Sequence, residues 1–246
     1  MKSKVLAVIA ARGGSKEVPK KNLKLLGGKP LVQYMFIKAK KLKCIDRAVC
    51  STDDNKIAEI AMECGIEVPF KRPAELAGDR TPLITVTQHA MFEMDKLRFK
   101  ADIIVQLAPT SPFIKIENIE RSINIVSKDD CECAVSLKRI EHEHPYRARK
   151  IIDEDYFENF ITDINVEEKK YHARQDLPLL YCTSGGLYTR KRHLLEEYDE
   201  SDFAMGETRK GIIMDDIESI NIDRMIDFHF AEFLIEKGYV SSDYLT

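Results

Sequence analysis

A short Gly-rich, basic segment holds the residue types best suited to binding an anion. It reads ARGGSKEVPKKN over residues 11–22 and follows an apolar run. Gly13 and Gly14 let the backbone turn sharply and bring its amide groups close to a ligand, and Pro19 stiffens the turn. The cations of the segment are Arg12, Lys16, Lys20 and Lys21. We interpret it as a phosphate-binding loop with exposed cations. The alternative is a solvated basic turn.

Two further polar turns follow apolar runs, STDD at 51–54 and APTSP at 108–112. Asp53 and Asp54 are candidate metal ligands, although Thr52 or Asp53 could equally cap a helix that begins there. Thr110 and Ser111 could hydrogen-bond a ligand or simply form the turn. The pair Asp215 and Asp216 leaves a similar choice between metal ligands and a solvated turn.

The elements that must position these turns alternate between strand and helix patterns. Apolar runs predict strands at 4–11, 45–51, 102–107 and 133–137, and helical spacing predicts helices at 31–42, 53–64, 82–97 and 117–127. This order predicts an α/β fold with a doubly wound, mostly parallel, Rossmann-like sheet. Such sheets bind ligands at the carboxyl ends of their strands, so the three polar turns should line one rim.

The alternation falters between residues 139 and 180. This segment carries aromatic residues among charged ones, including Tyr146, Tyr156, Phe157 and Phe160. We predict that residues 1–246 form one domain with an inserted arm at 139–180, and that the exposed aromatics of the arm make an interface. The histidines of HEH at 142–144 are expected in a solvated or interface loop. Strands at 185–189 and 211–214 and a helix at 224–237 complete the chain.

Composition excludes several classes of protein. The formal net charge is -3, so non-specific nucleic-acid binding is not expected. The apolar runs are too short to span a membrane and the amino terminus lacks a signal-peptide pattern, so we expect a cytoplasmic protein without membrane contact. Six cysteines lack any C-x-x-C spacing, so they are expected to be reduced thiols rather than zinc ligands.

Segments along most of the chain resemble, in order, the signatures of the CMP-sugar synthetases. These are the cytidylyltransferases that act on sialic, legionaminic, pseudaminic and related keto-acid sugars. The segments are ARGGSK followed by PKKN, STDDNKIAEIA at 51–61, VPFKRPAELAGD at 68–79, PTSPF at 109–113, RQDLP at 174–178, GGLY at 185–188 and INID at 220–223. The resemblance implies that the chain converts CTP and an acidic nine-carbon keto-sugar into a CMP-sugar and pyrophosphate.

The resemblance also implies roles for single residues. Catalytic roles fall to the cations that grip the triphosphate, Arg12, Lys16 and Lys21. The nucleotide-binding set is Ala11, Arg12, Gly13, Gly14, Lys16, Lys21, Asn22 and Arg72. On the sugar side Arg174 would face the carboxylate, with Thr110 and Ser111 beside it. Asp223 and Asn221 would hold Mg²⁺ or Mn²⁺, and the arm would reach the partner subunit of a homodimer.

Four departures from the family pattern bear on these roles. Ala10 and Glu17 replace the usual Pro and Gly of the loop. Ala108 replaces a Gln that often contacts the sugar acid, and Cys182 and Ser184 replace Arg and Asn. Asn221 replaces the first Asp of I-D-I-D, which removes a charge. The lost polar groups favour a legionaminate-type sugar over sialate. The alternatives are a nucleotidyltransferase of the same fold that uses another base or a sugar phosphate, and a non-catalytic nucleotide or sugar-acid binding protein.

Overall fold

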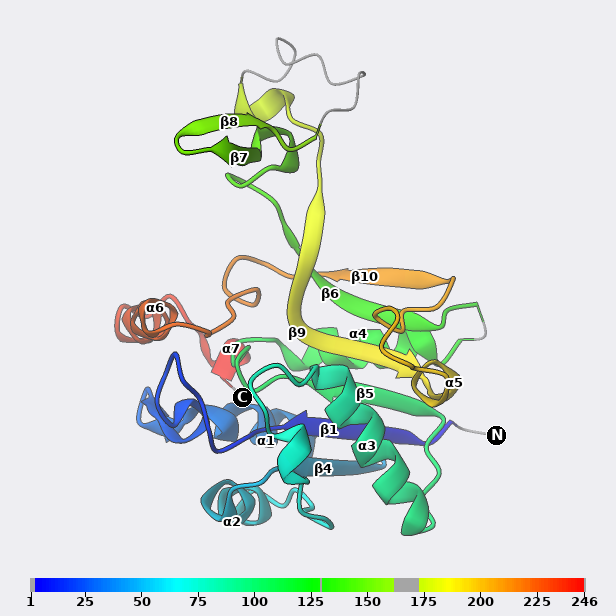
Figure 1. Ribbon diagram of the computed structural model, residues 1–246. Helices are drawn as coiled ribbons and strands as arrows, with labels where there is room; N and C mark the ends of the chain where they lie inside the picture. Colours follow the sequence, from blue (N-terminus) through cyan, green and yellow to red (C-terminus); the bar gives the residue numbers. More distant parts are fainter. Residues whose placement is uncertain (1–2, 129, 162–172, 246) are drawn as a thin grey trace.

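A six-stranded sheet forms the centre of the molecule (Figure 1). The computed structural model describes residues 3–128, 130–161 and 173–245. The strand order across the sheet is β10-β6-β9-β5-β1-β4. The strands are β1 Val5–Ala10, β4 Arg47–Ser51, β5 Ile103–Leu107, β6 Cys133–Arg139, β9 Tyr181–Lys191 and β10 Arg209–Ile213.

The sheet is mostly parallel, as the sequence predicted. β1 pairs in parallel with β4 and β5, and β10 pairs in parallel with β6. The exception is β9, which runs antiparallel between β5 and β6. The predicted strand at 185–189 is therefore the central part of a longer strand that runs in the opposite direction. The pairing of β9 with β6 changes register between Val135 and Leu137.

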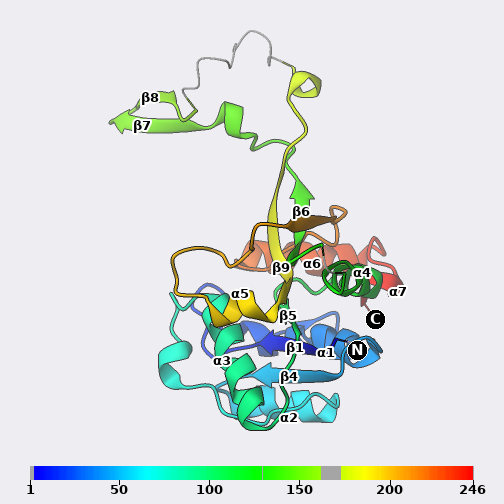
Figure 2. The same ribbon diagram turned by 90° about the vertical axis from the view of Figure 1, so that its right-hand side faces the viewer.

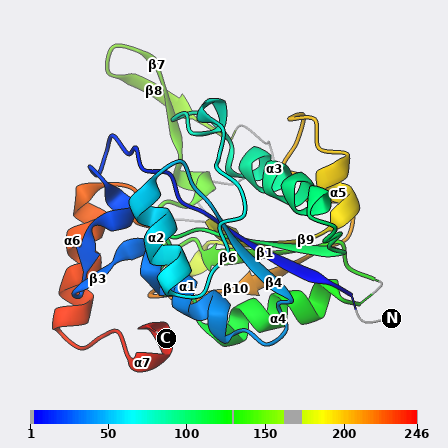
Figure 3. The ribbon, with the colours of Figure 1, turned by 90° about the horizontal axis from the view of Figure 1, so that it is seen from below.

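Helices cover both faces of the sheet, because the side chains of a strand alternate between its two faces. Val5, Ala7 and Ile9 of β1 belong to one core, while Leu6 and Val8 belong to another. The first core is covered by α1 Leu31–Lys41, α2 Asn55–Glu63 and α4 Ile116–Val126, and the second by α3 Leu83–Lys96 and α5 Arg192–Glu196. Figure 3 shows these two layers on opposite sides of the strands.

A third apolar cluster joins the carboxyl-terminal helices to the body of the chain. It packs Phe228 and Leu234 against Leu26, Leu31 and other residues of the amino-terminal half. The elements involved include α6 Met225–Glu236, α7 Ser242–Leu245, β2 Leu25–Leu26 and β3 Lys29–Pro30. Among the described residues, no helix has both the length and the apolar character needed to cross a membrane.

The segment between β6 and β9 extends away from the central sheet (Figures 1 and 2). It carries the antiparallel hairpin of β7 Arg149–Asp153 and β8 Tyr156–Asn159, and the short 3-10 helices η3 Pro145–Arg147 and η5 Arg174–Asp176. Residues 162–172 of the predicted arm lie outside the described residues. His144 is buried. Its Nε2 lies 3.1 Å from the Pro178 carbonyl oxygen, and its Nδ1 accepts a hydrogen bond from the Tyr146 amide. The loop predicted to be solvated or at an interface is thus exposed at His142 but not at His144.

The cap of α2 also differs from the prediction. The helix begins at Asn55, and Asp54 is its N-cap, accepting hydrogen bonds from the amides of Lys56 and Ile57. Thr52 Oγ1 in turn accepts from the Asp54 amide at 3.1 Å. The carboxylate of Asp53 does not cap the helix. It accepts a hydrogen bond from the phosphate loop instead.

Candidate active site

A cleft of about 300 Å³ lies where β1 and β5 end. Two of the three polar turns singled out in the sequence line it, and the turn after β4 contacts the first of them through the bond from the Gly13 amide to Asp53. Residues from the first and third of these turns, from the segment 72–86 and from the carboxyl-terminal loop line the cleft. Its polar lining includes Arg12, Lys21, Asn22, Arg72, Asp79 and Asp223. Leu76, Leu83 and Val86 add apolar surface to the same cleft.

The backbone of the phosphate loop is fixed by the acidic turn after β4. The Gly13 amide donates a 3.0 Å hydrogen bond to Asp53 Oδ1. A Cβ on Gly13 would lie 2.6 Å from Asp54 Oδ2, so this position needs glycine for a close approach. A Cβ on Gly14 would meet nothing within 4 Å, which leaves space for a ligand beside its backbone. Ala11 is fully buried and bonds the Ser51 carbonyl, so Ala10 rather than Ala11 lines the cleft.

Asp79 holds two of the predicted phosphate-binding cations. Arg12 Nη1 lies 3.0 Å from Asp79 Oδ1, and Lys16 Nζ lies 2.5 Å from Asp79 Oδ2. The hydrogen bond from Lys16, supported by the charge of Arg12, lowers the pKa of the Asp79 carboxyl. The cations are therefore neutralised by a carboxylate that itself lines the cleft, at a place where a ligand phosphate would compete for them.

Lys21, in the amino-terminal part of the chain, is held by two residues of the carboxyl-terminal loop. Its Nζ lies 3.0 Å from Asp223 Oδ1 and donates to the Ile222 carbonyl at 2.9 Å. The Lys21 side chain is only 14% exposed, whereas that of Lys16 is 84% exposed. The expectation that the loop cations are uniformly exposed was therefore wrong for Lys21. Its burial raises the strength of its electrostatic contacts, because water screens them less.

Arg72 and Asn22 form the buried floor of the cleft. Arg72 is 4% exposed and donates from Nε to Ser51 Oγ at 3.2 Å and from Nη2 to the Ser51 carbonyl. Burial lowers the pKa of Arg72, and the charge of Asp53 opposes that shift. Asn22 Nδ2 donates to the Arg12 carbonyl at 2.8 Å, but its buried Oδ1 has no partner.

A second cavity, of about 490 Å³, adjoins the first. Asp223 is the one described residue that lines both cavities. The second cavity is otherwise polar, with Lys138, Thr183, Ser184, Asn221, Arg224 and Asp227 in its lining. Two ligands, one in each cavity, would thus meet at the carboxylate of Asp223.

The residues around Asp223 fit a divalent cation that a phosphate completes. Asn221 Nδ2 donates to Asp223 Oδ2 at 2.6 Å, and the buried Asn221 Oδ1 has no partner. The pair therefore offers hard oxygen donors, one of them unsatisfied. Mg²⁺ is commonly bound by one or two carboxylates plus substrate phosphates rather than by a full protein cage. Among the described residues no group of three or more His, Cys, Asp or Glu side chains could hold a metal alone.

Thr110 and Ser111 have different surroundings. Thr110 lines the first cavity, and its carbonyl accepts the Ile222 amide at 2.7 Å. Ser111 is 1% exposed, and its Oγ has no partner. A Cβ on Gly186 would lie 2.6 Å from that oxygen, so Gly186 is required for the close packing of the turn on β9. Ser111 therefore faces the protein interior rather than either cavity.

Three residues that the sequence related to the site lie away from it. Arg174 is on the extended segment, forms an ion pair with Glu141 and lines neither cavity. Cys182 also lines neither cavity, whereas Ala108 lines the first. Asp215 accepts from the amides of Ile217 and Glu218, so it forms a turn rather than a metal site.

Sequence reasoning missed Asp79 as a site residue, although it closes the quoted segment VPFKRPAELAGD. The signal available was an acidic residue next to Gly78 in a segment already placed on the nucleotide side. Glycine-flanked acidic turns are common on protein surfaces, so this signal alone is weak. Its pairing with Arg12, which lies in a different turn, becomes visible only in three dimensions.

Comparison with known proteins gives consistent relatives. A family model described as cytidylyltransferase matches residues 6–221. A CMP-N,N'-diacetyllegionaminic acid synthase of Legionella pneumophila is 32% identical over 95% of this chain and 97% of its own length. A pseudaminic acid cytidylyltransferase of Campylobacter jejuni is 28% identical over 97% of this chain and 99% of its own.

A solved structure shows the same fold at low identity. It is titled a CMP:2-keto-3-deoxy-manno-octonic acid synthetase complexed with CTP. Its TM-score is 0.70 at 17% sequence identity, and the alignment covers 96% of this chain and 100% of that chain. The likeness extends over the whole described fold.

Proposed function

Because this chain belongs to the cytidylyltransferase family and is a nucleotidyltransferase, we propose that it transfers the cytidylyl group of CTP to a nonulosonic acid. The products are a CMP-sugar and pyrophosphate. The observation that carries the proposal is the convergence of Arg12, Lys21 and Arg72 on one cleft that adjoins a second polar cavity at Asp223. CTP would occupy the first cavity and the sugar acid the second.

The reaction joins the two ligands at the boundary of the two cavities. The anomeric hydroxyl oxygen of the sugar acid forms a bond to the α-phosphorus of CTP. The bond from that phosphorus to the oxygen bridging to the β-phosphate breaks, and pyrophosphate leaves with the electron pair. The attacking hydroxyl loses its proton, and Asp223 is a carboxylate placed between the cavities that could accept it.

The loop cations would supply electrostatic catalysis. Negative charge builds on the phosphate oxygens as the α-phosphorus is attacked, and fixed cations in a partly buried cleft stabilise it. Lys21 is the best placed of the described cations, since it is largely buried and contacts Asp223. When the triphosphate binds, Arg12 and Lys16 would leave the Asp79 carboxylate and pair with phosphate oxygens. Ion pairs within the protein are thus replaced by ion pairs with the ligand.

Mg²⁺ or Mn²⁺ would be held by Asp223 and Asn221. When bound, the ion would withdraw electron density from the phosphate oxygens and orient them. Asn221 contributes an unsatisfied buried oxygen, and Asp223 contributes the negative charge. Lys21 would then share the Asp223 carboxylate with the ion, because its Nζ already lies 3.0 Å from Asp223 Oδ1.

The sugar is proposed to be of the legionaminate type. Support for this choice comes from the CMP-N,N'-diacetyllegionaminic acid synthase that is 32% identical over 95% of this chain. The cytoplasm is the proposed location, because the reaction consumes CTP.

A homodimer is proposed because Arg174 lies outside both cavities of its own chain, on the segment that exposes Tyr156 and Phe157.

A substrate panel tests the proposal directly. The purified chain is incubated with CTP and Mg²⁺ and with diacetyllegionaminate, N-acetylneuraminate or a sugar phosphate, and pyrophosphate and CMP-sugar are measured. The expected result is turnover with the nonulosonic acids, with higher kcat/KM for diacetyllegionaminate. Matched reactions with ATP, GTP or UTP should be poor. A preference for N-acetylneuraminate would remove the specificity claim alone, and failure with every keto-acid would remove the proposed reaction.

A further inference from the structure

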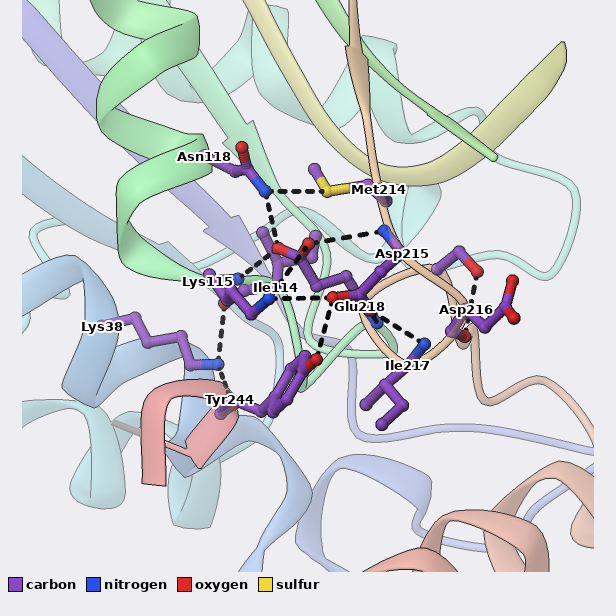
Figure 4. A network of polar contacts seen from close by, with 11 residues as sticks. Lys38, Ile114, Lys115, Asn118, Met214, Asp215, Asp216, Ile217, Glu218 and Tyr244 are labelled. Carbon is purple, nitrogen blue, oxygen red and sulfur yellow. Dashed lines mark hydrogen bonds and ion pairs between the residues drawn. The ribbon is translucent and has the colours of Figure 1, made fainter. Parts of the chain in front are cut away.

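A lysine of the first helix is buried between the turn after β5 and the carboxyl-terminal helix α7. Lys38, on α1, has a side chain that is fully buried. Its Nζ donates to the carbonyls of Pro112 at 2.6 Å and Ile114 at 2.8 Å, and also to that of Tyr244 (Figure 4). An ammonium group has three N–H donors, and these three carbonyls satisfy all of them. Loss of any one would leave a buried charge with an unpaired donor, which is costly.

A buried glutamate contacts the same turn after β5 and belongs to the loop between β10 and α6. Glu218 is 3% exposed, and its Oε1 accepts from the Lys115 amide at 2.9 Å and from Asn118 Nδ2 at 2.8 Å. Lys115 ends the turn that follows β5, while Glu218 belongs to the loop between β10 and α6. The carboxylate therefore ties the turn at 108–115 to the loop at 214–223.

Tyr244 contacts both sides of this junction. Its carbonyl accepts from Lys38, and its hydroxyl donates to Asp215 Oδ2 at 2.8 Å. Lys115 Nζ lies 4.4 Å from the centre of its ring and 2.8 Å from the same Asp215 oxygen. Figure 4 shows the tyrosine of α7 reaching both loops. We call Lys38, Glu218 and Tyr244 the C-terminal clasp.

The two loops held by the clasp both enter the active site. The turn at 108–115 contains Thr110, whose carbonyl accepts the amide of Ile222 at 2.7 Å. Ile222 directly precedes Asp223, and its own carbonyl accepts from Lys21. These hydrogen bonds, together with the short backbone segments between them, connect the clasp to the residues at the boundary of the two cavities. None of the three clasp residues lines either cavity.

We propose that the C-terminal clasp positions Asp223 for the reaction, by fixing the loop at 214–223 against the turn that carries Thr110. Residues 242–245 thereby act on the active site without touching a ligand. The family match ends at residue 221, so Tyr244 lies beyond it. The kinetic part of this inference rests on the proposed cytidylyl transfer, whereas the structural coupling does not.

Two variants of the carboxyl terminus test the clasp. Deletion of residues 242–246 removes the contacts of Tyr244 with Lys38, Asp215 and Lys115, and Tyr244→Phe removes only the hydrogen bond to Asp215. A displacement of about 1 Å in a catalytic group costs on the order of 100-fold in rate, so the deletion should lower kcat at least about tenfold. Tyr244→Phe should give a smaller loss in the same direction. The KM for CTP should change less than kcat, because Arg72 and the phosphate loop remain in place.

Hydrogen exchange supplies a readout that does not depend on turnover. Amides in 214–223 and 110–115 should exchange faster in both variants, and those of β1 and β4 should not. Tyr239→Phe is the matched control, since Tyr239 is a nearby tyrosine that is 61% exposed, and it should change neither readout. If the deletion variant does not fold, Tyr244→Phe carries the test.

The outcomes separate the clasp from the proposed reaction. Wild-type kcat and wild-type exchange in Tyr244→Phe and in the folded deletion variant would overturn the inference. Lower stability with an unchanged kcat and unchanged exchange at 214–223 would also overturn it, because the clasp would then be a structural anchor alone. If the wild-type chain turns over no sugar acid, the proposed function fails, and the exchange experiment still decides whether the clasp controls the loop.

Discussion

Lys21 and Asp223 lie 202 positions apart in the sequence, and Lys21 Nζ lies 3.0 Å from Asp223 Oδ1. The contact joins the phosphate loop to the carboxyl-terminal loop at the boundary of two cavities. Each residue sets the electrostatic environment of the other. A change at Lys21 should therefore affect both phosphate binding and any metal held at Asp223.

Lys21→Ala should lower kcat roughly 10²- to 10³-fold, which is the effect of removing one preorganised donor to a developing charge. The free energy of unfolding should fall by only about 1 kcal/mol, because one net hydrogen bond and a partly exposed ion pair are lost. Steady-state kinetics and urea denaturation measure the two effects. Lys20→Asn is the matched control, since it removes a neighbouring charge at a position with a left-handed φ of 51° that asparagine tolerates. Near-normal turnover of Lys21→Ala would contradict the role of this cation.

The sequence alone predicted the elements whose structure depends on residues that are close together in the chain. The apolar run of β1, the helical spacing of α1 after Pro30 and the glycines of the loop each signal their structure within a few residues. Family membership, predicted from the motifs, is confirmed by the match over residues 6–221. Contacts between distant residues carry no such signal. Lys38 resembles the exposed Lys40 and Lys41 of the same helix, and only the three carbonyls around it explain its burial.

Asp79→Asn should tighten the binding of CTP and of pyrophosphate severalfold. The substitution removes the carboxylate that neutralises Arg12 and Lys16, so phosphate oxygens no longer compete with it. Cytidine, which has no phosphate, should bind equally well to both proteins. Isothermal titration calorimetry with the three ligands measures this, and Glu75→Gln, in the same segment, is the control. Weaker binding of pyrophosphate to Asp79→Asn would show that Asp79 assists the phosphate site instead of blocking it.

Asn221→Asp should make the protein more dependent on divalent cations. Asn221 now donates a hydrogen bond of 2.6 Å to Asp223, and a carboxylate in its place would repel that residue. In EDTA the variant should therefore have a lower Tm than the wild type. Mg²⁺ should raise its Tm by a larger amount, and half-maximal activity should need less Mg²⁺. Asp223→Ala should abolish activity. Turnover that persists in EDTA would count against a metal at this site.

Lys38 should make stability depend on pH in the alkaline range. Burial lowers the pKa of Lys38 from 10.5 to about 7, and the charge of Glu218 opposes the shift. Between these values the unfolded chain binds more protons at this residue, so the free energy of unfolding should rise with pH, by at most about 1.4 kcal/mol per pH unit. Below pH 7 both states are protonated and the cost of burying the charge is fully present.

Urea denaturation of the wild type and Lys38→Met between pH 6 and 10 measures this effect. The difference in stability should shift in favour of the wild type as pH rises above about 7, since Lys38→Met has no group that titrates there. Lys41→Met, an exposed position on the same helix, should give a difference that does not vary with pH. A constant difference for Lys38→Met as well would show that the pKa of Lys38 is not lowered.

The arm illustrates where local pattern could not place a residue. Sequence reasoning gave Arg174 a role on the sugar side, but the structure places it beside Glu141 on the extended segment, away from both cavities of its own chain. The hairpin of that segment exposes Ile151, Tyr156 and Phe157, which are 63%, 72% and 61% exposed. Apolar groups of this size are stabilised by burial at about 25 cal/mol per Å². A second copy of the chain would provide that burial and bring Arg174 to a site.

We therefore expect a dimer in which Arg174 serves the site of the partner subunit. Light scattering should give the mass of a dimer at micromolar concentration, and Phe157→Glu should shift it towards the monomer. Mixing tests the exchange of residues. Lys21→Ala and Arg174→Ala, each expected to have low activity alone, are denatured together and refolded as mixed dimers. If Arg174 acts on the partner's site, one site of each mixed dimer holds both native residues, so activity returns. If Arg174 acts within its own chain, both sites stay defective, and the absence of recovery in mixed dimers of confirmed composition would contradict the predicted arrangement.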